Sequence, residues 1–222
     1  MLYNRFVGMS IVGARGKVVL ERPSVSTDAK TFLTPEQYLE IERKAEFKSE
    51  YYQGKMFRMD RDMVAVADVK ENHNLLVVNL VAALHPQLRA GPCRLFAHDM
   101  GVRVSAPEPH VCPDVIAVYG ERQFLDDQKE TLLNPTLIVE VIAPSTEAYD
   151  RGRKFHLYQS IESSTEYLLV SSDRLNVDLY TRLPGGGWLL TSADRLEDVL
   201  DLQSVGCRLL LADLYENVEL EK

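Results

Sequence analysis

The chain has 222 residues, of which 45% are hydrophobic and 26% are charged, and its formal net charge is −8. This length and composition are typical of a globular protein with one sizeable core. The acidic charge argues against a broad, non-specific grip on nucleic acid, which needs many contacts from Lys or Arg to phosphates, and no apolar run approaches the roughly 20 residues that span a bilayer.

The three cysteines, Cys93, Cys112 and Cys207, contain no C-x-x-C pair. We therefore expect neither a disulfide framework nor a structural zinc site, and a reducing, cytoplasmic location fits this pattern. Residues 1–31 are poorly patterned and are expected to form an N-terminal extension ahead of a single domain over residues 32–222.

That domain opens with a strong signal for a helix start. Thr34 can act as the N-cap, Pro35 occupies the first helical position and Gln37 can return the capping hydrogen bond. Residues 49–60 then predict a β-hairpin with its turn at Gln53 and Gly54.

A second helix is predicted over residues 72–88, where Pro86 is expected to end or kink it. Its apolar side carries Leu76, Leu80, Val81 and Leu84. Strands follow at 93–99, 101–105, 114–120 and 135–143, and a third helix is expected over residues 147–161. The remaining predicted elements are a strand at 165–172, a hairpin of strands 176–182 and 187–192, and a short helix at 209–218. Helices bracketing mostly sequential strands indicate an α/β fold with a mixed sheet.

One acidic residue is out of place in this pattern. Glu140 interrupts the apolar strand "PTLIVEVIA", and an unpaired carboxylate in an apolar layer costs several kcal/mol or becomes neutral. Asp114 begins the preceding strand, so the two carboxylates can point to the same face of the sheet. Such an oxygen-rich pair suits Mg²⁺ or Mn²⁺, and a bound cation would neutralise the buried charge.

The third helix adds a cation to this arrangement. Asp150, Lys154 and Tyr158 are spaced four residues apart and should share one helix face. A lysine there can neutralise developing charge or orient a water molecule. A metal ion, carboxylates and a lysine together form the chemistry of phosphodiester hydrolysis.

Structural explanations exist for each residue alone. Glu140 could be half of a structural ion pair, Asp114 an ordinary strand start and Lys154 a solvated helix residue. His73, at the start of the second helix, is more simply explained by capping or by core packing than by metal binding. The residues therefore point to function only as a combination.

In combination, the order Glu50-Tyr-x-x-Gly54, His73-Asn74, Pro113-Asp114-Val115, "NPTLIVEVIAPST", Asp150-x-x-x-Lys154-x-x-x-Tyr158 and "EYLLV" resembles the Uma-two family of endonucleases. The resemblance covers roughly residues 32–218 and implies a restriction-endonuclease-like core, a mixed β-sheet flanked by helices. The signature of that superfamily is PD…(D/E)-x-K. This sequence departs from it because Ile142 occupies the position of the lysine.

The resemblance also implies roles for single residues. Asp114, Glu140 and the carbonyl of Val141 would be the ligands of the metal, and Lys154, having migrated to the helix, would act as the catalytic lysine. Glu50 would supply a further acid. Asp150 and Tyr158 are accessory candidates, as is His73, which matches a family position to which the sequence assigns no role.

We therefore expect a Mg²⁺- or Mn²⁺-dependent endonuclease that hydrolyses DNA, with nucleic acid as partner and no membrane association. A homodimer would suit the cutting of two strands. Two alternatives stay open: a catalytically inactive nuclease-fold protein that binds nucleic acid or another partner, and a hydrolase of a small phosphorylated substrate. A shared fold alone does not decide between them.

Overall fold

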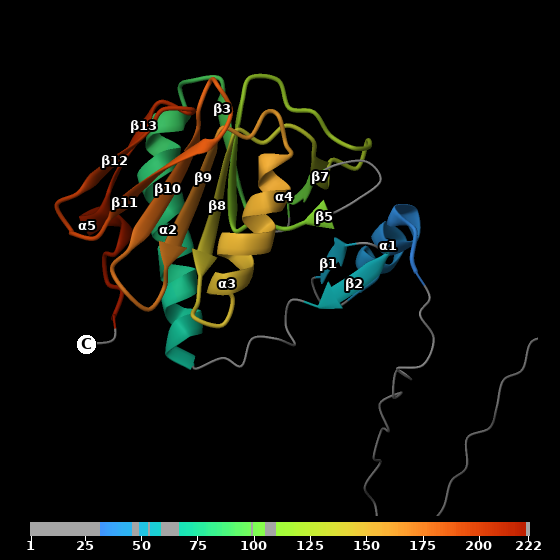
Figure 1. The fold of residues 1–222 in the computed structure, drawn as a ribbon, viewed down its shortest axis with the longest axis horizontal. Coiled ribbons are helices and arrows are strands. Elements are labelled where there is room, and N and C mark those ends of the chain that lie inside the picture. Colours follow the sequence, from blue (N-terminus) through green and yellow to red (C-terminus); the bar gives the residue numbers. More distant parts are fainter. Residues whose placement is uncertain are drawn as a thin grey trace, which may run out of the picture. The chain divides into compact units, whose positions relative to one another are not determined.

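The protein is represented by a computed structural model, which describes residues 32–45, 49–52, 54–58, 67–98, 100–104 and 110–220. Its main sheet has six strands in the order β11-β10-β9-β8-β6-β3 (Figure 1). The strands are β3 (Cys93–Ala97), β6 (Val115–Tyr119), β8 (Leu137–Ile142), β9 (Glu166–Ser171), β10 (Val177–Arg182) and β11 (Trp188–Ala193). The sheet is mixed because β8 and β9 run parallel, whereas the other neighbouring strands are antiparallel.

A second, five-stranded sheet has the order β2-β1-β5-β4-β7. It contains β1 (Ser49–Tyr52), β2 (Lys55–Arg58), β4 (Gly101–Arg103), β5 (His110–Val111) and β7 (Thr131–Leu132). A separate hairpin pairs β12 (Val199–Leu202) with β13 (Cys207–Leu210). The predicted α/β class with mixed pairing is confirmed, but the strands are divided among three sheets, and β5, β7, β12 and β13 were not predicted. The expected N-terminal extension and the turn residue Gln53 lie outside the described residues.

Helix α1 (Pro35–Glu42) begins where the sequence predicts. The Thr34 backbone N–H donates to Gln37 Oε1 over 2.8 Å, and the Gln37 backbone N–H donates to Thr34 Oγ1 over 3.3 Å. This reciprocal pair satisfies two amide groups that the first helical turn leaves without intrahelical partners.

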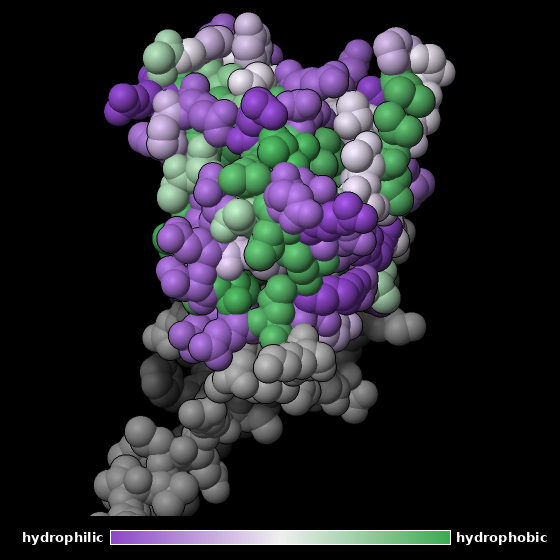
Figure 2. All heavy atoms as spheres, turned by 90° about the vertical axis from the view of Figure 1, so that its left-hand side faces the viewer, coloured by the Kyte–Doolittle hydropathy of each residue, from purple (hydrophilic) through white to green (hydrophobic). Residues whose placement is uncertain are grey.

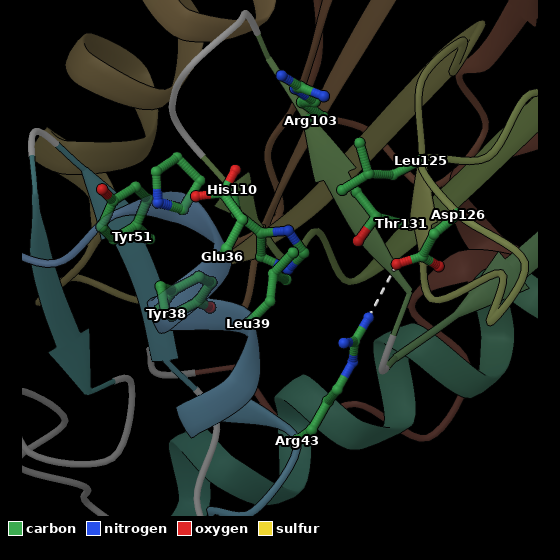
Figure 3. A pocket seen from close by; sticks show the side chains of 11 residues that line it. Glu36, Tyr38, Leu39, Arg43, Tyr51, Arg103, His110, Leu125, Asp126 and Thr131 are labelled. Atoms are coloured by element: carbon green, nitrogen blue, oxygen red, sulfur yellow. Dashed lines mark hydrogen bonds and ion pairs between the residues drawn. The ribbon is translucent and has the colours of Figure 1, made fainter.

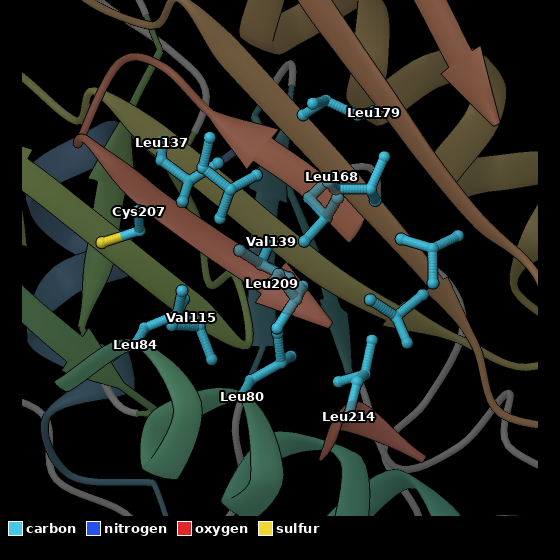
Figure 4. Close-up of a cluster of buried hydrophobic side chains, with 14 of the residues drawn as sticks. Leu80, Leu84, Val115, Leu137, Val139, Leu168, Leu179, Cys207, Leu209 and Leu214 are labelled. Carbon is cyan, nitrogen blue, oxygen red and sulfur yellow. The ribbon is translucent and has the colours of Figure 1, made fainter. Parts of the chain in front are cut away.

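Helix α2 (Ala67–Leu88) covers one face of the main sheet. Leu76, Leu80 and Leu84 are fully buried there, packed with Val115 and Val139 of the sheet (Figure 4). Pro86 does not end this helix, because the helix continues for two more residues to Leu88. A proline within a helix lacks one backbone hydrogen bond and crowds the carbonyl four residues earlier, which fits the end of the helix two residues later.

The opposite face of the main sheet is covered by a helical segment of three parts. These are α3 (Glu147–Tyr149), the π-helix η1 (Asp150–Lys154) and α4 (Phe155–Gln159). Buried Ile138 and Ile142 of β8 face this side with Tyr158 and Tyr167. The five-stranded sheet packs on the same core through Val102, Val111 and Leu132.

The last element, α5 (Leu211–Leu214), is shorter than the helix predicted at 209–218 because β13 takes its first two residues. Figure 2 shows the side of the molecule that carries β11, β12 and α5, where apolar side chains form a stripe among polar ones. The exposed large apolar residues of these strands are Leu189, Leu190 and Val199. No helix in the described part of the chain is both long and apolar enough to cross a membrane.

The packing of α2 predicts a strong position dependence for truncation. Leu80→Ala should destabilise the protein by about 2–5 kcal/mol, because the side chain is fully buried and its removal leaves a cavity. Val78→Ala on the same helix is the matched control, since Val78 is 63% exposed. Urea unfolding measures both variants, and equal losses would contradict the assignment of the buried face.

Candidate active site

The centre of the site is Glu140, in the middle of β8. All six residues of this strand are buried, and Glu140 is 3% exposed. Because side chains alternate along a strand, its carboxylate points to the same face as Ile138 and Ile142. Strand β8 lies inside the sheet, with β9 paired along one edge and β6 along the other.

Two side chains from the covering helical segment reach this carboxylate. The Tyr158 hydroxyl donates to Glu140 Oε1 over 2.7 Å, and Lys154 Nζ lies 3.0 Å from the same oxygen. Lys154 Nζ also lies 3.4 Å from Asp150 Oδ1. The predicted grouping of Asp150, Lys154 and Tyr158 on one side is therefore observed, and Lys154 is buried rather than solvated.

The backbone that carries Asp150 and Lys154 is a π-helix, where the sequence predicted a continuous α-helix. A π-helical turn is wider than an α-helical one, and such turns occur frequently at functional sites. Tyr167 of β9 supports this turn, because its hydroxyl donates to the Asp150 carbonyl over 3.2 Å. Tyr167 was not singled out by the sequence, since a buried aromatic in a strand carries no distinguishing signal.

An outer layer of ion pairs ties the same turn to the sheet. Arg151 Nε donates to Glu147 over 2.7 Å, and its Nη1 donates to Asp178 of β10 over 2.5 Å. Ser192 and Asn176 hold Asp178 with further hydrogen bonds. Because Arg151 lies between Asp150 and Lys154 in sequence, this anchor restricts how far either side chain can move from Glu140.

Asp114 lies next to this cluster at the start of β6. The register of β6 with β8 pairs Val115 with Val139, so one step further Asp114 stands opposite Glu140. Asp114 Oδ2 accepts the backbone N–H of Val141 over 2.8 Å, and His73 Nε2 lies 3.2 Å from Asp114 Oδ1. The structure thus gives His73 a specific partner that its position in the sequence did not reveal.

The two carboxylates titrate in opposite directions. Burial raises the pKa of Glu140 well above its ordinary value; Lys154 opposes this shift, and the charges of Asp114 and Asp150 add to it. Burial would also raise the pKa of Asp114, but the hydrogen bond and charge of His73 and the Val141 amide together lower it. The same contact raises the pKa of His73 against the effect of its burial.

The donor atoms of this site are compatible with a hard divalent cation. Within the described residues, both contacts to Glu140 go to Oε1, so Oε2 is left for another ligand. No group of three or more His, Cys, Asp or Glu in those residues forms a ready-made metal cluster. Mg²⁺ does not need one, because it commonly binds through one or two carboxylates and keeps several waters.

Two of the predicted site features, the Glu50 carboxylate and the Val141 carbonyl, stay predictions. The backbone of Glu50 pairs with Phe57 in the first hairpin, but its side chain lies outside the described residues. The Val141 carbonyl stays a predicted ligand. Ile142, at the position of the superfamily lysine, is 1% exposed and belongs to the apolar core.

Comparisons with known proteins give this geometry a context. The profile of the Uma2 family, described as "Putative restriction endonuclease", matches residues 35–212. Two relatives from Synechocystis sp. carry the name "Uncharacterized protein". The one designated slr1290 is 34% identical over 188 residues, 84% of this chain and 93% of that protein. The one designated sll1609 is 32% identical over 159 residues, 72% of this chain and 86% of that protein.

A solved structure confirms the fold class. A crystal structure from Anabaena variabilis, described as "a putative nuclease belonging to DUF820", matches with a TM-score of 0.60. The match covers 82% of this chain and 97% of that one at 17% sequence identity. At this level of identity the likeness concerns the fold, which is the predicted restriction-endonuclease-like one.

Replacing Lys154 should reveal how much burying Glu140 without a cationic partner lowers the free energy of unfolding. In EDTA, Lys154→Met should lower the free energy of unfolding by about 3–5 kcal/mol, because it leaves Glu140 without its cationic partner. The double variant Lys154→Met/Glu140→Gln should recover most of that loss. Lys44→Met is the control, since the Lys44–Glu40 pair is exposed to solvent and its loss should leave the stability nearly unchanged.

The loss of stability in Lys154→Met should depend on pH, and the pKa of Glu140 fixes the direction of that dependence. Because the pKa of Glu140 is raised in the folded state, that state retains a proton which the unfolded chain loses near pH 4.5. The contribution of Glu140 to stability therefore falls as pH rises above about 4.5. The deficit of Lys154→Met should accordingly grow with pH over this range, and a deficit independent of pH would contradict the ion pair.

Proposed function

The chain belongs to the Uma2 family, whose description reads "Putative restriction endonuclease", and on this premise we propose that it is a Mg²⁺- or Mn²⁺-dependent endonuclease that hydrolyses DNA phosphodiester bonds. The observation that carries the proposal is the contact of Lys154 with Glu140. The superfamily signature sets a lysine two residues after the acid. Here that position is apolar, yet an ammonium group from η1 lies 3.0 Å from the acid.

Each residue has a chemical task in this proposal. Asp114 and Glu140 would hold the cation, which when bound polarises the scissile phosphate and acidifies a water molecule. Asp114 is suited to this because its lowered pKa keeps it ionised at neutral pH. Lys154 would stabilise negative charge that develops on the phosphate, in a site where burial strengthens every electrostatic interaction.

The remaining residues position these groups. Tyr158 donates to Glu140 Oε1, so Oε2 would be the carboxylate oxygen that serves the cation. The Val141 amide and His73 fix the two oxygens of Asp114. Asp150, whose Oδ1 lies 3.4 Å from the ammonium, holds Lys154 near the acids.

The inactive alternative also has an observation in its favour. Lys154 and Tyr158 satisfy Glu140 without any cation, as expected for a structural ion pair. The net charge of −8 likewise gives no general attraction for DNA. A homodimer, which would bring two centres to two strands, stays a prediction; the uncharged edge strand β11, with Leu189 and Leu190 exposed, is the candidate surface for it.

A nuclease assay separates the two functions. With Mn²⁺ and both single- and double-stranded DNA, Lys154→Ala should cut the rate by orders of magnitude, because the interaction it removes is needed most in the transition state. Lys154→Arg should recover only part of the rate, since a planar guanidinium does not replace a compact ammonium. Lys44→Ala, which removes a lysine that is 72% exposed, should leave the rate unchanged.

Equal rates for wild type and Lys154→Ala would place the activity elsewhere or in a contaminant. No cleavage by wild type, together with retained DNA binding, would favour the inactive binding protein.

Cation binding can be tested without activity. Mg²⁺ or Mn²⁺ should raise the melting temperature of the wild type, because a ligand that binds only the native state stabilises it. Asp114→Asn should abolish this rise, whereas Asp201→Asn, which alters an exposed carboxylate paired with Arg208, should retain it. An equal rise in wild type and Asp114→Asn would count against the site.

A further inference from the structure

Gly152 lies exposed in the middle of the π-helix η1. A glycine inside a helix is less stable than an alanine, because its backbone loses more conformational freedom on folding. The φ angle of Gly152 is not in the left-handed region that would favour glycine. A Cβ atom built there would meet no heavy atom of the described residues within 4 Å, apart from its chain neighbours and the backbone of its own helix. Neither backbone conformation nor packing among those residues therefore calls for a glycine.

A glycine also lets a ligand approach the main chain closely, and the main chain at Gly152 is held in place for such a contact. Arg151, just before it, is anchored to Asp178 of β10 at 2.5 Å. Two residues after it, Lys154 lies 3.0 Å from Glu140. The π-helix thus presents a bare and fixed stretch of main chain beside the candidate active site.

Arg153 adds positive charge at the same place. Its guanidinium carbon lies 5.9 Å from the centroid of the Tyr149 ring, and Lys154 Nζ lies 5.8 Å from the same centroid. Both distances fit cation–π contacts, and both Tyr149 and Arg153 are half-buried. Because the two cations approach one ring, they are only a few nucleotides of a DNA strand apart, at about 3.4 Å of rise per nucleotide.

The charge of this turn contrasts with that of the whole chain. The net charge is −8, so an approaching phosphate needs cations that are gathered locally. The five residues of η1 supply three of them, Arg151, Arg153 and Lys154. Arg174 joins this group, because it and Arg151 contact the same oxygen of Glu147 at 2.5 and 2.7 Å. Glu147 neutralises part of the charge, and the balance of these five residues remains positive.

The cleft of about 300 Å³ between α1 and the five-stranded sheet is a less suitable surface for DNA (Figure 3). The rings of Tyr38 and Tyr51 are buried, so they offer no open face to a base. Arg43 is already held by Asp126 and Glu130 at 2.8 and 3.0 Å.

We propose that the main chain at Gly152 and the guanidinium of Arg153 bind the sugar-phosphate backbone of the DNA strand next to the phosphate that is cleaved. This inference rests on the proposed function for its substrate. The bare main chain lets the strand come close, and Arg153 contacts one of its phosphates. Contacts of this kind fix the position and register of a strand without reading its sequence. Gly152 and Arg153 are therefore positioning residues, which bring the scissile phosphate to Lys154 and the acids.

Variants of Gly152 test this role, because stability and binding should change in opposite directions. Gly152→Ala and Gly152→Gln should raise the melting temperature, since both side chains favour a helix and have open space. The same variants should weaken binding of single- and double-stranded DNA, glutamine more than alanine, because the side chain keeps the strand away. Fluorescence anisotropy of labelled DNA with the full chain, in EDTA at low salt, measures binding without cleavage. Gly91→Ala, at an exposed glycine after α2, should leave binding unchanged.

Arg153→Ala should weaken binding to every DNA sequence alike. It should also reduce the slope of log K against log salt concentration by about one, as the loss of one phosphate contact does. Arg208→Ala removes an exposed arginine of β13 and should retain the slope. In the nuclease assay with Mn²⁺, Gly152→Gln and Arg153→Ala should raise KM and leave kcat close to that of wild type, unlike Lys154→Ala.

The outcomes separate this inference from the proposed function. Weaker DNA binding by Gly152→Gln and Arg153→Ala, with no cleavage by wild type, would support the inference and count against the nuclease. Cleavage by wild type, with KM unchanged in both variants, would leave the nuclease standing and overturn the inference. A lower melting temperature of Gly152→Ala would also overturn it, because the glycine would then serve the fold. A wild type that binds no DNA in EDTA at low salt would overturn it as well.

Discussion

The burial of one carboxylate in an apolar strand constrains much of this structure. Glu140 lies in the centre of a fully buried β8, where an unpaired charge would cost several kcal/mol. The covering segment therefore has to deliver both an ammonium and a hydroxyl to one side chain. Lys154 and Tyr158 do so from consecutive parts of that segment, η1 and α4. Replacing the whole group by apolar residues of similar volume would generally cost nothing in stability, so its presence points to a use other than folding.

The fold holds this group from two sides. On the helical side, Arg151 ties η1 to Asp178 of β10, which limits the freedom of the turn that carries Lys154. On the sheet side, the antiparallel register of β6 and β8 brings Asp114 opposite Glu140, and the Val141 amide holds its carboxylate. The opposite face of the same sheet is packed by α2 with large aliphatic side chains. A rigid apolar layer thus separates the charged face from the far side of the molecule.

The sequence predicted those features that depend on local patterns. The capping residues placed the start of α1, and the position of Glu140 in an apolar strand, with an acid before it and a lysine after it, located the charged group. It did not predict the π-helix, because a five-residue turn forms there through tertiary contacts such as that from Tyr167. It missed β5 and β7, since strands of two residues are defined by their neighbours. The partner of His73 depends on a contact between residues far apart in sequence.

The central claim is that this buried charged group holds a cation for phosphodiester chemistry. Anomalous diffraction from crystals soaked in Mn²⁺ tests it most directly, because the signal locates the ion without reference to activity. The account predicts one strong peak between the Asp114 and Glu140 carboxylates, at roughly 2.0–2.2 Å from an oxygen of each, as is usual for a small divalent ion. Crystals that bind Mn²⁺ only elsewhere, with Lys154 still 3.0 Å from Glu140, would contradict the claim and leave a structural ion pair.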